Sequence, residues 1–313
     1  MTASPIHTEG GQALATEPRR LPAPRAVLEL LKPITWFAPM WALACGVVSS
    51  GQPVLDRWPF VLGAVLLAGP LMCGMSQAVN DWFDRHVDAI NEPQRPIPSG
   101  RIPGRWGLGI AVLWSALGVV VAAALGPWVL GVALVGLALA WAYSAPPLRL
   151  KANGWFGNAA VGLSYEGLPW FTGAAALSGA LPHPSIQALA ALYSAGAFGI
   201  MILNDFKAVE GDIEMGVRTL PVQLGVRPAV LLACVIMAAP QAVVVGLLSS
   251  WGRPIHAAVV LALLLLQVGL MVRLVRDPRG KAAWYNATGT TLYVLGMMVS
   301  AVAVRVITQG GTP

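Results

Sequence analysis

The chain has 313 residues, of which 56% are hydrophobic and only 11% are charged. Soluble domains carry roughly 25% charged residues, so a fold of this size must expose most of its surface to lipid. This composition excludes a cytosolic enzyme, a secreted disulfide scaffold and a disordered protein. The net charge of +6 has to be located along the chain before it can indicate a partner.

The apolar runs predict an all-α membrane protein. Residues 1–25 are polar, rich in Pro and Gly, and lack the regions of a signal peptide, so we expect a flexible cytoplasmic tail. Residues 26–313 are expected to form a single transmembrane domain with two related halves. A span needs roughly 20 apolar residues, and such runs predict about nine transmembrane helices, near residues 33–50, 59–79, 106–125, 127–143, 155–176, 185–203, 229–250, 255–272 and 284–307.

The basic residues agree with nine spans. With the N-terminus in the cytoplasm, all of the 20 Lys and Arg residues except Arg57, Arg253 and Arg305 fall in cytoplasmic segments. Positive charge accumulates on that side of membrane proteins. The C-terminus is then outside. Membrane topology therefore explains the excess of basic over acidic residues, and nucleic acid is not expected as a partner.

Eight of the 14 acidic residues lie in two short stretches or directly after them, as Glu92 and Glu214 do, and each stretch begins where an apolar span ends on the predicted cytoplasmic side. The first reads NDWFDRHVD and starts at Asn80; the second reads NDFKAVEGD and starts at Asn204. Both open with Asn-Asp, carry an Asp eight positions after the Asn, and precede an Arg-x-x-Pro sequence. The copies lie 124 residues apart, which indicates an ancient duplication of a helix pair and its loop.

The spacing within these stretches predicts a metal–phosphate site. Residues at i, i+4 and i+8 of a helix lie along one face, so each stretch forms an oxygen-rich stripe. A divalent hard cation removes the repulsion between carboxylates, and Mg²⁺, or Mn²⁺ in its place, accepts carboxylate and phosphate oxygens. The alternative is a pair of solvated helix ends capped by acids. The predicted metal ligands are Asn80, Asp84, Asp88, Asn204, Asp205 and Asp212.

Basic side chains in the same layer are suited to a diphosphate. The proline-rich loop after the first stretch and the loop after the fourth span both carry Arg, which makes bidentate contacts with phosphate. The alternative is anchoring to anionic lipid at the membrane surface. The candidate diphosphate-binding residues are Arg95, Arg101, Tyr143, Arg149, Lys151 and Lys207.

One charge, Glu166 in the sequence SYEGLPW, falls inside a predicted span. An intramembrane acid is costly and therefore a functional candidate. The alternative is a hydrogen-bonded structural group beside a helix broken by Pro169. The candidate catalytic residues are Asp84, Asp88, Arg95, Lys151 and Glu166.

These residues resemble the UbiA superfamily of intramembrane prenyltransferases. Its first Asp motif, Asn-x-x-x-Asp-x-x-x-Asp, matches Asn80, Asp84 and Asp88, and its nine-span plan covers nearly the whole chain. The segments NDWFDRHVDAINEPQRPIPSGRI, YSAPPLRLKANGWFGNAAVGLSYEGLPWFTGAA and NDFKAVEGDIEMGVRTLPVQLG are similar to the chlorophyll synthase branch, most of all to its bacteriochlorophyll synthases. At the position of Ala208 the superfamily usually has Asp. The chlorophyll synthase branch instead has a small residue there, and this chain resembles it.

The resemblance implies a reaction. A geranylgeranyl or phytyl group passes from its diphosphate to the propionate carboxylate of chlorophyllide or bacteriochlorophyllide, in an inner or photosynthetic membrane. It implies a UbiA-type bundle with a cytoplasmic active-site mouth, Mg²⁺ on the two stripes, and Arg95, Arg101 and Lys151 stabilising the departing charge. The acceptor carboxylate needs no general base, so Glu166 is expected to orient it. Membrane lipid and other pigment-biosynthesis enzymes are the further partners expected.

Other classes remain as alternatives. Within the superfamily, the acceptor is a quinone or haem precursor. A transporter is disfavoured because the two acidic copies face the same way. A pigment-binding protein without catalysis would need ligands such as His inside the spans, and no His lies well inside one.

Overall fold

The computed structural model describes residues 21–214 and 216–309, so the first 20 residues of the predicted tail lie outside the described part of the chain. Within those ranges the regular elements are helices, and the strand-type pairing is one isolated bridge between Asn153 and Arg218. The prediction of an all-α fold is confirmed.

The helices include two short 3₁₀ turns, η1 and η3, and two π-helical turns, η2 and η4. In chain order they are α1 (Pro24–Leu30), η1 (Pro33–Trp36), α2 (Phe37–Ser49), α3 (Trp58–Leu66), η2 (Leu67–Cys73), α4 (Gly74–Asn91), α5 (Trp106–Leu125), α6 (Pro127–Ser144), η3 (Leu150–Ala152), α7 (Gly154–Gly162), η4 (Leu163–Gly167), α8 (Leu168–Ser178), α9 (Pro184–Asp205), α10 (Val209–Glu214), α11 (Leu220–Leu224), α12 (Val226–Ser250), α13 (Pro254–Arg276) and α14 (Pro278–Gln309).

The described chain crosses a membrane several times. Seven helical segments are long and apolar enough to do so, or up to eight if α1 counts as one span with η1 and α2, from which it is bent by 42°. The continuous helical run of residues 154–178 is less apolar than these segments, because it carries polar side chains such as Asn158 and Glu166. It forms one further long helix of the bundle. The prediction of about nine helices is therefore roughly confirmed, and the chain is a multi-pass membrane protein.

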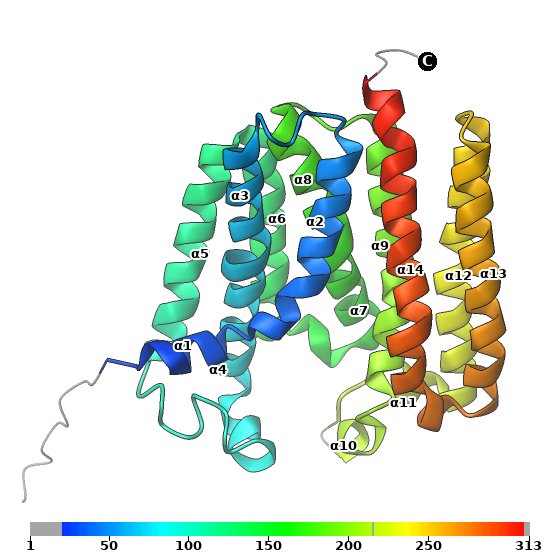
Figure 1. Ribbon diagram of the computed structural model, residues 1–313. Helices are drawn as coiled ribbons and strands as arrows, with labels where there is room; N and C mark the ends of the chain where they lie inside the picture. The colour runs from blue at the N-terminus through cyan, green and yellow to red at the C-terminus, as the bar shows by residue number, and fades with distance from the viewer. Residues whose placement is uncertain (1–20, 215, 310–313) are drawn as a thin grey trace, which may run out of the picture.

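The long helices lie side by side in a bundle, and different segments lie at its two ends (Figure 1). The C-terminal part of α4, with α10 and α11, lies at one end, where α1 crosses the bundle; the last turn of α14 lies at the opposite end. The second span is longer than predicted, because α3, η2 and α4 form one helix from Trp58 to Asn91. Both acidic stretches are thereby brought to the same end of the bundle.

Two prolines lie in or next to π-helical turns that border the cavity described below. Pro70 lies in η2, and Pro169 is the second residue of α8, two positions after the end of η4. Proline has no N–H, so the bond it would make to the carbonyl four residues earlier is missing, and a π-turn accommodates the gap. As a result η4 turns Tyr165 and Glu166 toward the centre of the bundle.

Close packing holds that centre together. A Cβ at Gly46 would collide with the carbonyl of Trp170, and a Cβ at Gly173 with the carbonyl of Leu43, so α2 and α8 approach through these glycines. Beside this contact the ring of Trp170 stacks on that of Tyr193, with centroids 5.6 Å apart. These large buried rings form the core on the far side of the cavity described next.

Candidate active site

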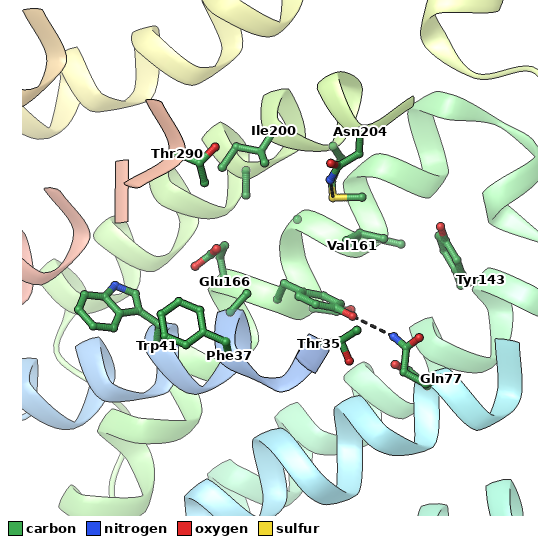
Figure 2. A pocket seen from close by; sticks show the side chains of 18 of the residues that line it. Thr35, Phe37, Trp41, Gln77, Tyr143, Val161, Glu166, Ile200, Asn204 and Thr290 are labelled. Carbon is green, nitrogen blue, oxygen red and sulfur yellow. Dashed lines mark hydrogen bonds between the residues drawn. The ribbon is translucent and has the colours of Figure 1, made fainter. Parts of the chain in front are cut away.

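A cavity of about 690 Å³ lies among η1, α2, α4, α6, α7, η4, α9 and α14. Pockets for small ligands typically measure about 300–1,000 Å³. Its wall is largely apolar, with a few polar groups that point inward, among them Gln77, Asn204, Thr290 and Glu166 (Figure 2). Phe37, which also lines it, is 66% exposed, so the cavity reaches the lipid-facing surface of the bundle.

A hydrogen-bonded set of side chains fixes one wall of the cavity. Nε2 of Gln77 donates to Oη of Tyr165 over 3.2 Å (Figure 2). Sγ of Cys73 lies 3.4 Å from Oγ1 of Thr35 and 3.6 Å from Oη of Tyr165. These contacts join η1, η2 and α4 to the π-turn η4, so the ring of Tyr165 has a defined position facing the cavity.

The first residues of both acidic stretches line this one cavity. Asn80 of α4 donates from Nδ2 to Oγ of Ser144 over 3.3 Å, and Nδ2 of Asn286 donates to Oδ1 of Asn204 over 2.8 Å. Asn80, Tyr143 and Asn204 all belong to the lining. Residues 124 positions apart in the sequence therefore meet at the cavity end nearest the acids.

Basic side chains hold the carboxylates of the first stretch. Nζ of Lys151 donates to Oδ2 of Asp84, and a guanidinium nitrogen of Arg149 lies 3.7 Å from Oδ1 of the same carboxylate. Arg95 donates to Oδ2 of Asp88 over 2.9 Å. The structure thus brings Asp84 and Asp88 together with three of the predicted cations, Arg95, Arg149 and Lys151.

Asp81 joins this cluster and was not among the predicted residues. Its side chain is 1% exposed and lies 2.7 Å from Nζ of Lys32 and 3.2 Å from Arg95. Lys32 has a left-handed backbone with φ of 47°, a conformation that needs support at a non-glycine residue. The signal in the sequence was the repeated Asn-Asp dipeptide, since an acid next to a stripe residue lies on a neighbouring helix face.

The second stretch is held by neutral donors. Nδ2 of Asn158 donates to Oδ2 of Asp205 over 3.1 Å, and Oγ1 of Thr219 donates to Oδ2 of Asp212 over 3.1 Å. Burial raises the pKa of Asp212, and the hydrogen bond from Thr219 opposes this shift. Lys207 is exposed and makes no ion pair with the described residues.

The loop after α6 connects the two stretches. Lys151 reaches Asp84 on one side. On the other side the amide of Gly154 donates to the carbonyl of Arg218 over 2.8 Å, and the amide of Arg218 donates to the carbonyl of Ala152 over 3.1 Å. The first and second stretches therefore lie on either side of this loop.

Arg101 lies apart from the acidic stripes. Its guanidinium pairs with Glu29 of α1 over 2.5 and 2.7 Å and also donates to the carbonyl of Gln94. The side chains of Arg101 and Glu29 are each somewhat less than half exposed. Arg101 therefore ties α1 to the proline-rich loop in this structure, while Arg95 and Lys151 point to the stripes.

The donor set suits a hard divalent cation. The stripe side chains offer only carboxylate and amide oxygens, the ligands that Mg²⁺ accepts together with phosphate oxygens. No three His, Cys, Asp or Glu side chains of the described residues already form a metal cluster, because Lys and Arg hold the carboxylates of the first stripe. Lys and Arg are also the side chains that bind phosphate oxygens in proteins.

Comparisons with known proteins agree with this geometry. The bacteriochlorophyll synthase 33 kDa chain of Cereibacter sphaeroides is 59% identical over 292 residues, covering 93% of this chain and 97% of the relative. The chloroplastic chlorophyll synthase of Arabidopsis thaliana is 40% identical over 291 residues, covering 88% of this chain and 73% of the relative.

A solved structure shares the fold. A UbiA homolog from Archaeoglobus fulgidus bound to GPP and Mg²⁺ matches with a TM-score of 0.69 at 20% identity, covering 89% of this chain and 99% of that chain. The model of the UbiA prenyltransferase family matches residues 35–300. With most of its length inside that match and relatives of 40% to 59% identity, the chain belongs to the UbiA prenyltransferase family.

Proposed function

We propose that the chain transfers a geranylgeranyl or phytyl group from its diphosphate to the propionate carboxylate of bacteriochlorophyllide or chlorophyllide. The observation that carries the proposal is the cavity whose one end is formed by the first residues of both acidic stretches, Asn80 and Asn204. The choice of acceptor is supported by the relatives at 59% and 40% identity, which are named bacteriochlorophyll synthase and chlorophyll synthase.

The diphosphate end of the site is assigned to the stripes and their cations. A divalent cation, Mg²⁺ or Mn²⁺, which share a preference for six oxygen ligands, supplies charge neutralisation when bound by the stripe oxygens. Lys151 and Arg95, which hold Asp84 and Asp88 in this structure, then turn to the phosphate oxygens. Positive groups placed where charge develops lower the barrier to bond cleavage.

The reaction breaks the allylic C–O bond of the prenyl diphosphate and forms one ester C–O bond. The electron pair of the broken bond leaves with the diphosphate, and the acceptor carboxylate attacks the prenyl carbon. A propionate is ionised at neutral pH, as a Glu side chain is, so the protein has to position the acceptor and no proton has to be removed.

We also propose an orientation. Among the described residues, Arg57, Arg253 and Arg305 lie at the end of the bundle opposite the acids, whereas the other Lys and Arg residues belong to segments at the acid end. By the positive-inside rule the acid end faces the cytoplasm, in an inner or photosynthetic membrane, and the end of α14 faces outward. The exposed side chains of Ile34 and Phe37 beside the cavity suit substrates that arrive from lipid.

The test is an assay of the purified full chain in lipid nanodiscs with bacteriochlorophyllide a and geranylgeranyl diphosphate, with Mg²⁺ or with EDTA. Asp84→Ala is compared with Asp56→Ala, an exposed acid on the other end of the bundle. We expect esterified pigment by chromatography only with Mg²⁺, in the wild type and in Asp56→Ala. Esterification that persists in EDTA or in Asp84→Ala contradicts the site, and turnover of a quinone precursor alone contradicts the acceptor.

A further inference from the structure

Glu166 is a buried carboxyl group that faces the cavity. Its side chain comes from the π-turn η4, is 6% exposed, and points into the cavity (Figure 2). Oε2 has no hydrogen-bond partner among the described residues. Glu166 is also the one Asp, Glu, Lys, Arg or His among the described residues that line the cavity.

The protein gives Glu166 no compensating group. Nε1 of Trp41 donates to the carbonyl of Val294 over 2.9 Å, and Oη of Tyr293 donates to the carbonyl of Tyr193, so these nearby donors are already used. A carboxyl group inside a membrane protein is costly unless something pairs with it. A bound molecule is therefore the group that remains to satisfy it.

Of the two substrates proposed above, only the acceptor fits this position. The prenyl diphosphate has an apolar tail and an anionic head, and the stripes at the other end of the cavity bind that head. The acceptor macrocycle carries a central Mg²⁺ with an open coordination position perpendicular to the ring. Mg²⁺ takes oxygen ligands, carboxylates in particular.

We propose that Glu166 binds the acceptor by coordinating the central Mg²⁺ of the chlorophyllide through its carboxylate. This inference rests on the proposed function. The site would hold the flat ring beside Phe37 and Trp41, whose rings are stacked with centroids 6.1 Å apart. Glu166 then acts as a substrate-binding residue that selects a metal-containing macrocycle, and it takes no part in bond cleavage.

A polar edge leads from Glu166 to the diphosphate end. Oγ1 of Thr290 and Oδ1 of Asn286 are buried without hydrogen-bond partners among the described residues, and both residues line the cavity. They are four residues apart on α14 and so share a helix face. Since Asn286 contacts Asn204, a ring anchored at Glu166 has unpaired polar groups along the path on which its propionate reaches the mouth.

The test compares binding of Mg-containing chlorophyllide with binding of its metal-free analogue, the pheophorbide, by fluorescence titration of the full chain in nanodiscs. The variants are Glu166→Leu, Glu166→Gln and, as a matched control, Thr290→Val, which removes a different unpaired polar group of the same cavity. We expect the wild type to prefer the Mg pigment by at least about tenfold, the loss that removal of even an outer partner of a metal ligand causes.

In Glu166→Leu we expect this preference to disappear while the affinity for pheophorbide is kept. Glu166→Gln should retain part of the preference, because an amide oxygen is a weaker ligand, and Thr290→Val should retain all of it. Unchanged binding of a geranylgeranyl diphosphate analogue checks that each variant is folded. If Glu166→Leu is not folded, the preference measured in Glu166→Gln decides.

Three results overturn the inference. Equal wild-type affinity for the two pigments excludes coordination, and so does an equal loss of both pigments in the folded Glu166 variants. Failure of the wild type to bind either pigment overturns the proposed acceptor, and the inference with it. The first two results leave the proposed function standing, so the two failures are distinguishable.

Discussion

The ammonium group of Lys151 donates a hydrogen bond to the carboxylate of Asp84, which lies 67 residues earlier in the chain. Burial lowers the pKa of Lys151, and the hydrogen bond to Asp84 opposes that shift. The contact joins the loop after α6 to the first acidic stripe. Lys151 therefore contacts a proposed metal ligand, and under the proposed function the same ammonium group would contact a phosphate oxygen of the prenyl diphosphate.

Lys151→Met should therefore lose activity at the diphosphate step. We predict that kcat for prenyl transfer falls about a hundredfold, the usual cost of removing one group that stabilises developing charge, and that KM for the prenyl diphosphate rises. The control is Lys281→Met, which removes an exposed cation from the first turn of α14. Steady-state kinetics over a range of diphosphate concentrations checks this, and equal kinetics of the two variants would show that Lys151 only anchors the loop.

Asp81 should contribute to stability and to the position of Arg95. Its buried carboxylate contacts Lys32 and Arg95 together, and loss of one partner of a buried ion pair costs about 3–5 kcal/mol. We predict that Asp81→Ala lowers the thermal unfolding temperature in detergent and raises KM for the prenyl diphosphate. Asp56→Ala, at an exposed acid that makes no ion pair with the described residues, should do neither. An unchanged unfolding temperature in Asp81→Ala would falsify the role of this cluster.

The local pattern in the sequence predicted one half of this site. The spacing of Asn80, Asp84 and Asp88 within one helix is a local property, and the structure contains that helix as α4. The cations Arg95 and Lys151 were predicted because Pro-rich loops with basic residues lie on the same side of the membrane. The metal and phosphate roles of all these residues stay predictions until the variants are measured, as do the two related halves of the domain.

The sequence pattern could not predict contacts between residues that are far apart in the chain. Lys32 meets Asp81 across 49 residues, and Arg101 meets Glu29 across 72. Which cation reaches which acid depends on how α1 crosses the end of the bundle, and helical periodicity contains no information about that crossing. The π-turns at Pro70 and Pro169 likewise follow from a missing N–H, but how the turn aims Glu166 depends on packing against α2 and α9.

The identity of the divalent cation offers a further prediction. Because the stripe oxygens and phosphate oxygens suit small cations with six oxygen ligands, Mg²⁺ and Mn²⁺ should both restore activity after EDTA treatment. Ca²⁺ prefers six to eight ligands at longer distances, so we predict a much lower rate with it. Initial rates at equal free concentrations of the three ions measure this. Full activity with Ca²⁺, or without any added ion, contradicts a Mg²⁺-type site.

The contact between α2 and α8 makes a prediction about the wall behind Glu166. At Gly173 an added Cβ would meet the carbonyl of Leu43 and the backbone of Val47, and backbone cannot move aside as a flexible side chain can. We predict that Gly173→Ala costs about 1–3 kcal/mol in unfolding free energy, as overpacking of a core does. The displaced α8 would also shift η4, so affinity for the pigment should fall.

Gly131 provides the matched control for that substitution. It lies within α6, and an added Cβ there has no heavy atom within 4 Å. Ala is favoured over Gly in a helix by about 1 kcal/mol, so Gly131→Ala should be neutral or stabilising. Thermal unfolding and pigment titration of both variants give the comparison. Equal stability of Gly173→Ala and Gly131→Ala would mean that α2 and α8 do not approach as closely as the glycines allow, and that the position of Glu166 is set by other contacts.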